Sequence, residues 1–373
     1  MMEILKKSII LSLGIFFLFA CSSGDEVDDQ IKTITDFVLE VEKLGDGEVR
    51  ASFSATNAIY FKISFGTSGE TPQRVDGNSA TFKYTEKGDY TVVVQAHSSD
   101  SDFVVSTEKV TMNAEALGLG PDAGYKSPET YAGYNLVWAD EFNSTTLSED
   151  WIFELGDGCP DLCGWGNQEL QYYKKENTSL ADGKLIITAK RETTSGKSYS
   201  SSRLITKGKK SFTYGRIDIR AILPKGQGLW PALWMLGENI DAVGWPKSGE
   251  IDIMEMVGGD IDDRDRTTHG TVHWDNAGSY ANYGGSTKLS TGKFNDEYHV
   301  FSIDWDPEKI VWLLDGEEFH VIDITPAGLD EFHKPMFFIF NVAVGGIWPG
   351  SPDGSTVFPQ EMKVDYVRVF QKE

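Results

Sequence analysis

The chain has 373 residues, a hydrophobic fraction of 40% and a charged fraction of 24%, which is typical of a folded globular protein and excludes a disordered one. Lysine and arginine number 34 against 57 aspartates and glutamates, so the net charge is −23 and a phosphate backbone would be repelled. We therefore expect no nucleic-acid partner. The 38 glycines and the aromatic fraction of 12% favour short strands joined by tight turns.

Residues 1–20 predict a secretory signal, because two lysines precede an apolar run that is too short to span a membrane. The run ends in a segment from Leu18 to Cys21 that resembles a bacterial lipobox. This resemblance implies lipidation of Cys21, and the acidic stretch Asp25–Asp29 resembles the export tags of surface lipoproteins in some Gram-negative bacteria, so we expect an exported lipoprotein at the outer membrane or cell surface of such a bacterium. A plain signal peptide with an incidental cysteine is the alternative. Residues 21–31 are rich in aspartate and glutamate and predict an acidic tether.

The tryptophans all follow residue 132, which divides the rest of the chain into two regions of different composition. In the first region, residues 32–113, apolar and polar residues alternate in Val49–Phe53, Ile59–Ile63 and Tyr90–Val94, as in half-buried strands. We expect a small β-sandwich that resembles a polycystic-kidney-disease-type (Ig-like) domain and acts as a spacer or a weak sugar contact. Residues 114–132 contain several glycines and prolines and predict a linker.

Cys159 and Cys163 follow early in the second region. In an exported protein, two nearby cysteines predict a disulfide that closes a short loop. A metal pair is disfavoured, because no other cysteine or ordered histidine motif completes a site. Two free thiols are the alternative.

The second region, residues 133–373, has many short strand patterns and no long amphipathic helix pattern. This predicts one all-β sandwich or barrel domain. The segments expected to be strands are Lys184–Ala189, Tyr214–Leu223, Glu250–Val257, Thr271–Trp274, Tyr298–Trp305, Ile310–Leu314, Met336–Val342 and Lys363–Phe370.

One of these strands carries three carboxylates in the pattern E-x-D-x-x-E. In a regular strand Glu250 and Asp252 point to one face, and the isoleucines that follow them point to the other. Strict alternation would bury Glu255 in the core, where an unpaired carboxylate is costly. One extra residue, a β-bulge around Met254, returns Glu255 to the acidic face. The pattern therefore predicts three carboxylates on one face of a bulged strand.

Three neighbouring carboxylates disfavour one another's ionisation, so at least one should keep its proton near neutral pH. A protonated acid beside an ionised one is what retaining glycoside cleavage requires, with the two carboxyl groups about 5–5.5 Å apart. An acidic edge strand without a catalytic role is the alternative.

The bulged motif resembles that of glycoside hydrolase family 16 and, with its flanking segments, the laminarinase branch of endo-β-1,3-glucanases. The resemblance covers the second domain and implies a curved β-jelly-roll sandwich with a concave glycan cleft. It also implies that Glu250 is the nucleophile, that Asp252 hydrogen-bonds it, and that Glu255 is the general acid and then the general base. The flanking segments are Gly164–Tyr173, Tyr214–Arg220, Pro224–Leu236 and Asn341–Gly350.

Further side chains are expected to bind sugar, because tryptophan suits the apolar face of a sugar ring and amides or cations suit its hydroxyls. By resemblance, Asn167 and Arg216 contact the cleaved sugar and His273 lies beside the acids. Core packing is the alternative for the tryptophans, an ion pair with Asp218 for Arg216, and a structural role for His273. The other expected substrate-binding residues are Trp230, Trp234, Asn341 and Trp348.

The resemblance implies no catalytic cofactor and a structural calcium ion at Glu141, the carbonyl of Gly183 and Asp365, a donor set of the kind that a hard cation prefers. We expect a monomer that hydrolyses internal β-1,3-glucosidic bonds of laminarin-type β-glucans by double displacement and touches the membrane only through its lipid anchor. Three alternatives stay open. They are the same chemistry on mixed-linkage β-glucan or on a galactan such as agar or porphyran, a transglycosylase, and a non-catalytic surface glycan-binding protein.

Overall fold

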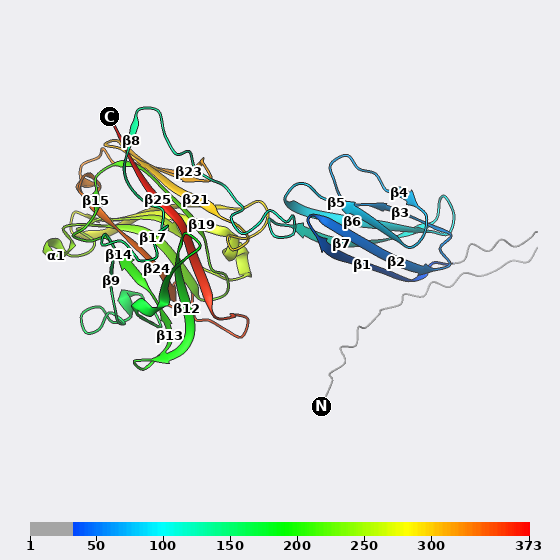
Figure 1. The fold of residues 1–373 in the computed structure, drawn as a ribbon, viewed down its shortest axis with the longest axis horizontal. Coiled ribbons are helices and arrows are strands. Elements are labelled where there is room, and N and C mark those ends of the chain that lie inside the picture. Colours follow the sequence, from blue (N-terminus) through cyan, green and yellow to red (C-terminus); the bar gives the residue numbers. More distant parts are fainter. Residues whose placement is uncertain (1–32) are drawn as a thin grey trace, which may run out of the picture.

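A computed structural model describes residues 33–373, so the predicted signal, acidic tether and lipidation site Cys21 lie outside the described residues. The described residues form two β-domains that follow one another along the long axis of the molecule (Figure 1). In this part of the chain, no helix is both long enough and apolar enough to cross a membrane.

The first domain is a sandwich of two antiparallel sheets with the strand orders β1-β2-β5 and β4-β3-β6-β7. Buried side chains from both sheets, among them Phe53 and Val94, form one core. This confirms the predicted β-sandwich, while its relation to polycystic-kidney-disease-type domains stays a prediction. The strands are β1 (Thr35–Gly45), β2 (Glu48–Thr56), β3 (Tyr60–Ser64), β4 (Gln73–Val75), β5 (Ser79–Lys83), β6 (Gly88–His97) and β7 (Phe103–Met112).

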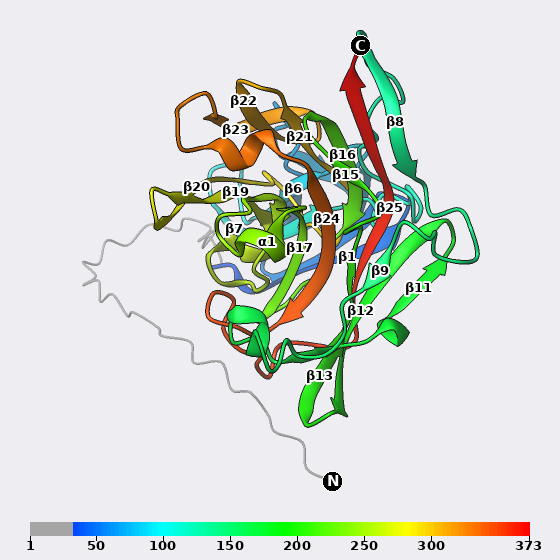
Figure 2. The same cartoon turned by 90° about the vertical axis from the view of Figure 1, so that its left-hand side faces the viewer.

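The second domain is a jelly-roll sandwich of a ten-stranded and an eight-stranded sheet, so the predicted fold class is confirmed. The larger sheet has the order β10-β13-β12-β25-β16-β21-β22-β23, with β11 on β12 and β8 on β25. The smaller has the order β20-β19-β18-β17-β24-β14-β9, with β15 on β24. Long strands such as β24 and β25 curve along their length (Figure 2). Apolar side chains of both sheets, for example Ile217 and Ile251, meet in one core.

Each segment predicted as a strand in this domain lies on a strand of the structure. The elements are β8 (Tyr134–Asp140), β9 (Ile152–Phe153), β10 (Gln171–Tyr173), β11 (Thr178–Ala181), β12 (Lys184–Thr194), β13 (Lys197–Ser201), β14 (Arg203–Ile205), β15 (Ser211–Phe212), β16 (Gly215–Ile222), β17 (Leu229–Gly237), α1 (Ile240–Val243), β18 (Glu250–Glu255), β19 (Thr267–Asn276), β20 (Ser279–Lys288), β21 (His299–Trp305), β22 (Lys309–Leu314), β23 (Glu317–Asp323), β24 (Met336–Val344) and β25 (Gln360–Lys372).

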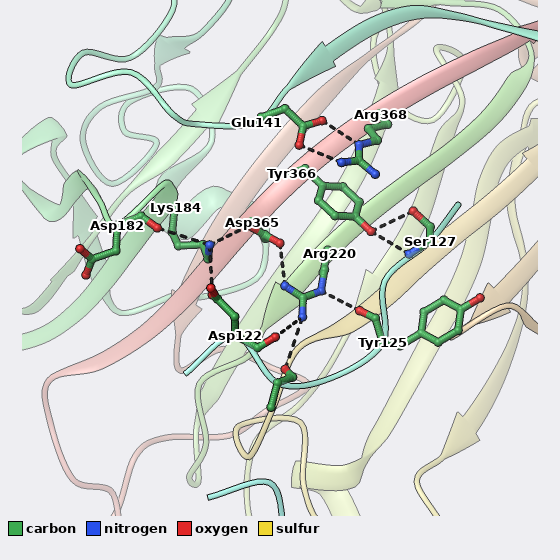
Figure 3. Close-up of polar contacts among 11 residues, drawn as sticks. Asp122, Tyr125, Ser127, Glu141, Asp182, Lys184, Arg220, Asp365, Tyr366 and Arg368 are labelled. Atoms are coloured by element: carbon green, nitrogen blue, oxygen red, sulfur yellow. Dashed lines mark hydrogen bonds and ion pairs between the residues drawn. The ribbon is translucent and has the colours of Figure 1, made fainter. Parts of the chain in front are cut away.

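The later part of the predicted linker packs on the second domain rather than standing free. Arg220 of β16 is fully buried, and its guanidinium donates to the carbonyls of Tyr125 at 2.6 Å and Asp122 at 2.8 Å (Figure 3). The same guanidinium pairs with Asp365 of β25 at 2.6 Å. Because a buried arginine must satisfy its donors, this arrangement holds the linker backbone on the outer face of the ten-stranded sheet.

Two tyrosine hydroxyls hold the segment that follows. Tyr366 of β25 accepts a hydrogen bond from the backbone N–H of Ser127 at 2.9 Å (Figure 3). Tyr131 donates to Oδ2 of Asp218 on β16 at 2.7 Å. We call residues 122–131 the docked segment.

Candidate active site

The acidic face forms where β18 carries a bulge. In the ladder between β17 and β18, Trp234 pairs with Asp252 and Leu233 pairs with Met254, so Ile253 is the extra residue. Ile253 and Met254 both contribute to the core. Glu255 therefore returns to the face of the other two carboxylates, which confirms the predicted bulge.

The backbone of the bulge is held from the core side. The indole N–H of Trp312 donates to the carbonyl of Asp252 at 2.8 Å. Trp312 belongs to β22 of the opposite sheet and is fully buried. Gly270 of β19 leaves room for the indole, because a Cβ atom there would lie 2.3 Å from a ring carbon. This hydrogen bond thus connects the two sheets at Asp252, the residue just before the bulge.

Glu250 is held by groups from two sides. The indole N–H of Trp245, in the loop before β18, donates to its Oε2 at 3.0 Å. Nε2 of His273, on β19, lies 3.7 Å from Oε1 of Glu250 and 3.0 Å from Oδ2 of Asp252. One atom from each of these two acids and His273 lies within 4.8 Å of the others. The structure thus brings His273 beside the acids, as predicted.

Glu255 has its own indole partner, since Trp230 donates to its Oε1 at 3.0 Å. The ring of Trp348 stands edge-on to Trp230 with 5.5 Å between centroids, and His269 lies 5.0 Å from Trp348. Trp348 is 42% exposed, so its ring is open to a ligand. The two predicted tryptophans therefore lie on the Glu255 side of the acidic face.

Burial raises the pKa of all three carboxyl groups, each to about 8. Repulsion from Asp252 adds to this effect at Glu250 and Glu255, while His273 and the indole N–H partners lower the pKa of both glutamates. At neutral pH the cluster therefore carries fewer than three negative charges. A proton is therefore available to give, and nucleophilic attack requires Glu250 to be the carboxyl group that ionises.

Trp234 and Asn341 belong to a hydrogen-bonded chain next to the acids. Trp234 donates to Oδ1 of Asn341 at 2.8 Å, and Asn341 donates to the hydroxyl of Tyr173 at 3.1 Å. That hydroxyl donates to Glu169, which also accepts a hydrogen bond from Asn167. Glu169 is 5% exposed, so this chain of polar groups is largely sealed from water. Asn167 is thus connected to the acidic face through buried groups.

The loop that carries Asn167 starts from a crosslink. Cys159 and Cys163 form a disulfide, as predicted. The indole of Trp165, two residues beyond it, faces the guanidinium of Arg203 at 4.5 Å, and Trp234 faces the same group at 4.9 Å. Arg203 thus connects the loop to the predicted platform Trp234, and the disulfide closes the segment just before Trp165.

Arg216 does not belong to the site, which corrects the prediction. It lies on β16 in the ten-stranded sheet and donates to Oδ1 of Asp218 at 2.7 Å. Its neighbour Ile217 points into the core, so Arg216 points outward, away from the eight-stranded sheet that carries the acids. The ion pair with Asp218, the alternative interpretation, is what the structure has.

The predicted calcium set does not fit a cation either. Arg368 binds both carboxylate oxygens of Glu141, at 2.7 and 2.9 Å (Figure 3). Asp365 lies between Lys184 at 2.8 Å and Arg220 at 2.6 Å. Calcium needs free oxygen ligands. Here positively charged side chains occupy the carboxylate oxygens of Glu141 and Asp365, so these two residues do not fit a cation as arranged, and the calcium ion at Glu141, Gly183 and Asp365 stays a prediction.

Sequence reasoning missed three aromatic residues near the acids. Trp245 lies in a loop, where no strand alternation predicts its direction. His269 pairs with Glu255 across β18 and β19, and Tyr280 on β20 contacts His273. The alternation of His269, Thr271 and His273 on one strand face was the available signal for His269.

This fold and this paired-acid strand define a glycoside hydrolase. The description "Glycosyl hydrolases family 16" matches residues 163–368, more than half of the chain, and the chain belongs to that family. Catalysis in the family needs no cofactor.

The chain is also similar to individual proteins and to solved structures. The chain is 41% identical over 270 residues to "Beta-glucanase" of Rhodothermus marinus, covering 68% of this chain and 89% of that protein. It is 39% identical over 241 residues to "Clotting factor G alpha subunit" of Tachypleus tridentatus, covering 64% of this chain but only 34% of that protein. Among solved structures, the laminarinase catalytic domain of Thermotoga maritima matches with a TM-score of 0.60 and 44% identity. That match covers 64% of this chain and 99% of the laminarinase domain.

Proposed function

We propose that this chain hydrolyses internal β-1,3-glucosidic bonds of laminarin-type glucans and retains the configuration at the cleaved carbon. The observation that carries the proposal is one bulged strand that presents Glu250, Asp252 and Glu255 on one face, with an indole N–H on each glutamate. Similarity to the laminarinase domain of Thermotoga maritima supports the choice of glucan.

The mechanism has two displacements. The Glu250 carboxylate attacks the anomeric carbon and forms a glycosyl ester, while Glu255 gives its proton to the departing glycosidic oxygen. Water then attacks the same carbon, Glu255 takes a proton from it, and Glu250 leaves as a carboxylate. The N–H of Trp245 favours the ionised form of Glu250, since it lowers the pKa of that carboxyl. Trp230 does the same for Glu255 after proton transfer.

The test is a product profile on laminarin, lichenan, agarose and carrageenan, with the anomer of the first product followed by proton NMR. We expect oligosaccharides of several lengths from laminarin, released first as the β-anomer. No products from laminarin would refute the substrate, and an α-anomer released first would refute retention. Products from lichenan or agarose alone would favour mixed-linkage glucan or a galactan. Longer products at high oligosaccharide concentration would indicate transglycosylation. No products from any polymer, with binding retained, would favour a glycan-binding protein.

We also propose that the protein is an exported, lipid-anchored monomer at the outer membrane or cell surface. The support is the lipobox-like segment that ends at Cys21. A Cys21→Ala variant expressed in a Gram-negative host is expected to move from the membrane fraction to the soluble fraction. Retention in the membrane fraction would contradict the anchor. Sedimentation of the protein without its signal tests the monomer.

A further inference from the structure

Tyr280 lies on the edge strand β20, outside the three-acid motif, yet it contacts the acidic face. In the ladder between β19 and β20, Tyr280 pairs with Asp275 and His273 pairs with Asn282. Tyr280 and His273 are therefore diagonal neighbours on the same face of the sheet. The Tyr280 hydroxyl lies 2.8 Å from Nδ1 of His273, and the two rings stack at 5.7 Å between centroids with 13° between their planes.

The two nitrogens of His273 thus have different partners. Nε2 faces the acids, 3.0 Å from Asp252 and 3.7 Å from Glu250, while Nδ1 faces Tyr280. A neutral imidazole has one N–H donor and one acceptor nitrogen, and a partner at one nitrogen selects the tautomer. When the Tyr280 hydroxyl donates to Nδ1, the proton of the imidazole resides on Nε2 and points at the carboxylates. The opposite tautomer would aim a lone pair at Asp252.

Tyr280 also contacts the other partner of the nucleophile. Its ring lies 5.1 Å from the ring of Trp245, whose N–H donates to Glu250. Burial first, and then the nearby acids, raise the pKa of Tyr280, so its hydroxyl keeps its proton at neutral pH. A hydroxyl donor is therefore present throughout the working range of the acids.

We infer that Tyr280 is a positioning residue for the nucleophile: its hydroxyl fixes the tautomer of His273 whose Nε2–H faces Asp252 and Glu250. The inference rests on the proposed hydrolysis mechanism and deepens it. Tyr280 itself transfers no proton to the sugar. It acts through His273, which the carboxylates of Glu250, Asp252 and Glu255 face from β18.

The test compares Tyr280→Phe with Tyr283→Phe in the full chain. The first change removes only the hydroxyl and keeps the ring for stacking. Tyr283 is the matched control, because it is similarly exposed on the same strand but pairs with Val272, which belongs to the core, and contacts His320. We expect Tyr280→Phe to lower kcat on laminarin about tenfold with KM changed less than about twofold. Tyr283→Phe should behave as wild type.

Two readouts separate positioning from a structural role. The acid-side limb of kcat/KM should move to higher pH in Tyr280→Phe, because a lone pair facing Asp252 makes ionisation of the acids less favourable. Nitrogen-15 NMR of His273 should show a single Nε2–H tautomer in wild type and a mixture in Tyr280→Phe. An unchanged tautomer and unchanged kcat in Tyr280→Phe would overturn the inference.

A role as a sugar platform gives a different pattern. In that case Tyr280→Phe would be silent and Tyr280→Leu would raise KM, which also overturns the inference. If the wild type failed to cleave laminarin, the proposed function would fall. The NMR comparison would still decide whether Tyr280 selects the tautomer.

Discussion

Trp312 donates its indole N–H through the core to the carbonyl of Asp252, and so holds the bulge from the opposite sheet. A Trp312→Phe change removes that donor and keeps most of the ring. Because a buried carbonyl would lose a partner, we expect a loss of about 1–3 kcal/mol in the free energy of unfolding. We also expect a fall of tenfold or more in kcat, since the bulge aims Glu255.

The matched control for that change is Trp305→Phe. Trp305 lies on β21, in the same sheet as Trp312, and is similarly buried. Its indole N–H donates to the carbonyl of Phe332 at 3.0 Å, which is not part of the acidic face. Denaturant unfolding and laminarin kinetics on both variants check the prediction. An equal loss of kcat in both, after correction for the folded fraction, would show that the bulge contact has no special role.

Glu250→Gln should abolish turnover and yet raise the melting temperature. The amide oxygen can still accept from Trp245, while the cost of a buried charge disappears. Burial raises the pKa of Glu250 to about 8 from 4.5, so the carboxyl keeps its proton in the folded state where the unfolded chain has lost it.

The sign of the pH dependence follows from this difference. The contribution of Glu250 to stability is full below the unfolded pKa and is lost as pH rises through the folded pKa of about 8. One pKa unit is about 1.4 kcal/mol, and one kcal/mol is roughly 2–4 °C in a domain of this size. We expect Tm of Glu250→Gln to exceed that of wild type by at least roughly 3 °C above this folded pKa and to match it near pH 4. A constant difference across pH would contradict the assignment.

Glu255→Gln should separate substrates by their leaving groups. Laminarin needs a proton on the departing oxygen, so its hydrolysis should fall by about 10²–10⁴-fold. In aryl β-glucosides, an acidic phenol can leave without that proton, so the rate of their hydrolysis should fall less. Wild-type activity should decline as pH rises through about 8, where Glu255 loses its proton, and this decline should weaken in the variant with aryl substrates. Equal losses on both substrates would show that Glu255 is not the acid.

Removal of divalent cations should leave the second domain unchanged. Lys184 and Arg220 already neutralise Asp365, and Arg368 binds both oxygens of Glu141. We expect the same Tm in EDTA and in excess calcium, measured on one preparation by calorimetry. A rise in Tm with calcium concentration would indicate a bound ion and contradict this interpretation of the pairs.

The acidic face could be predicted from sequence because one physical penalty decided it. Glu255 in the core would have been an unpaired buried charge, so the bulge was the available solution. Arg216 was misplaced by the resemblance, and strand alternation could not correct it. Alternation gives the face of a strand but not the sheet to which that strand belongs. Placing Trp245 near the acids requires the conformation of a loop, and placing Tyr280 there requires the register of β20. Local sequence patterns contain neither.

The packing of the linker and the cations beside the calcium set could not be predicted for another reason. Glycine and proline content predicts a loop but does not say what that loop packs against, so the docking of Asp122 and Tyr125 on Arg220 was not foreseeable. Likewise, the resemblance transferred Glu141 and Asp365 without the cations beside them. Both the packing of the linker and the ion pairs of these acids depend on residues that are distant in sequence.

Arg220 also decides how the second domain would carry load. If the chain is anchored through Cys21 as we propose, a pull from the membrane side reaches the docked segment before it reaches β8. Among the first bonds to bear tension would be those from Arg220 to the carbonyls of Asp122 and Tyr125, and the pair with Asp365 holds that guanidinium in place. These bonds sit on β16 and β25, which are neighbours within the ten-stranded sheet. The arginine would therefore keep a pull on the anchored chain from peeling the N-terminal strand of the catalytic domain.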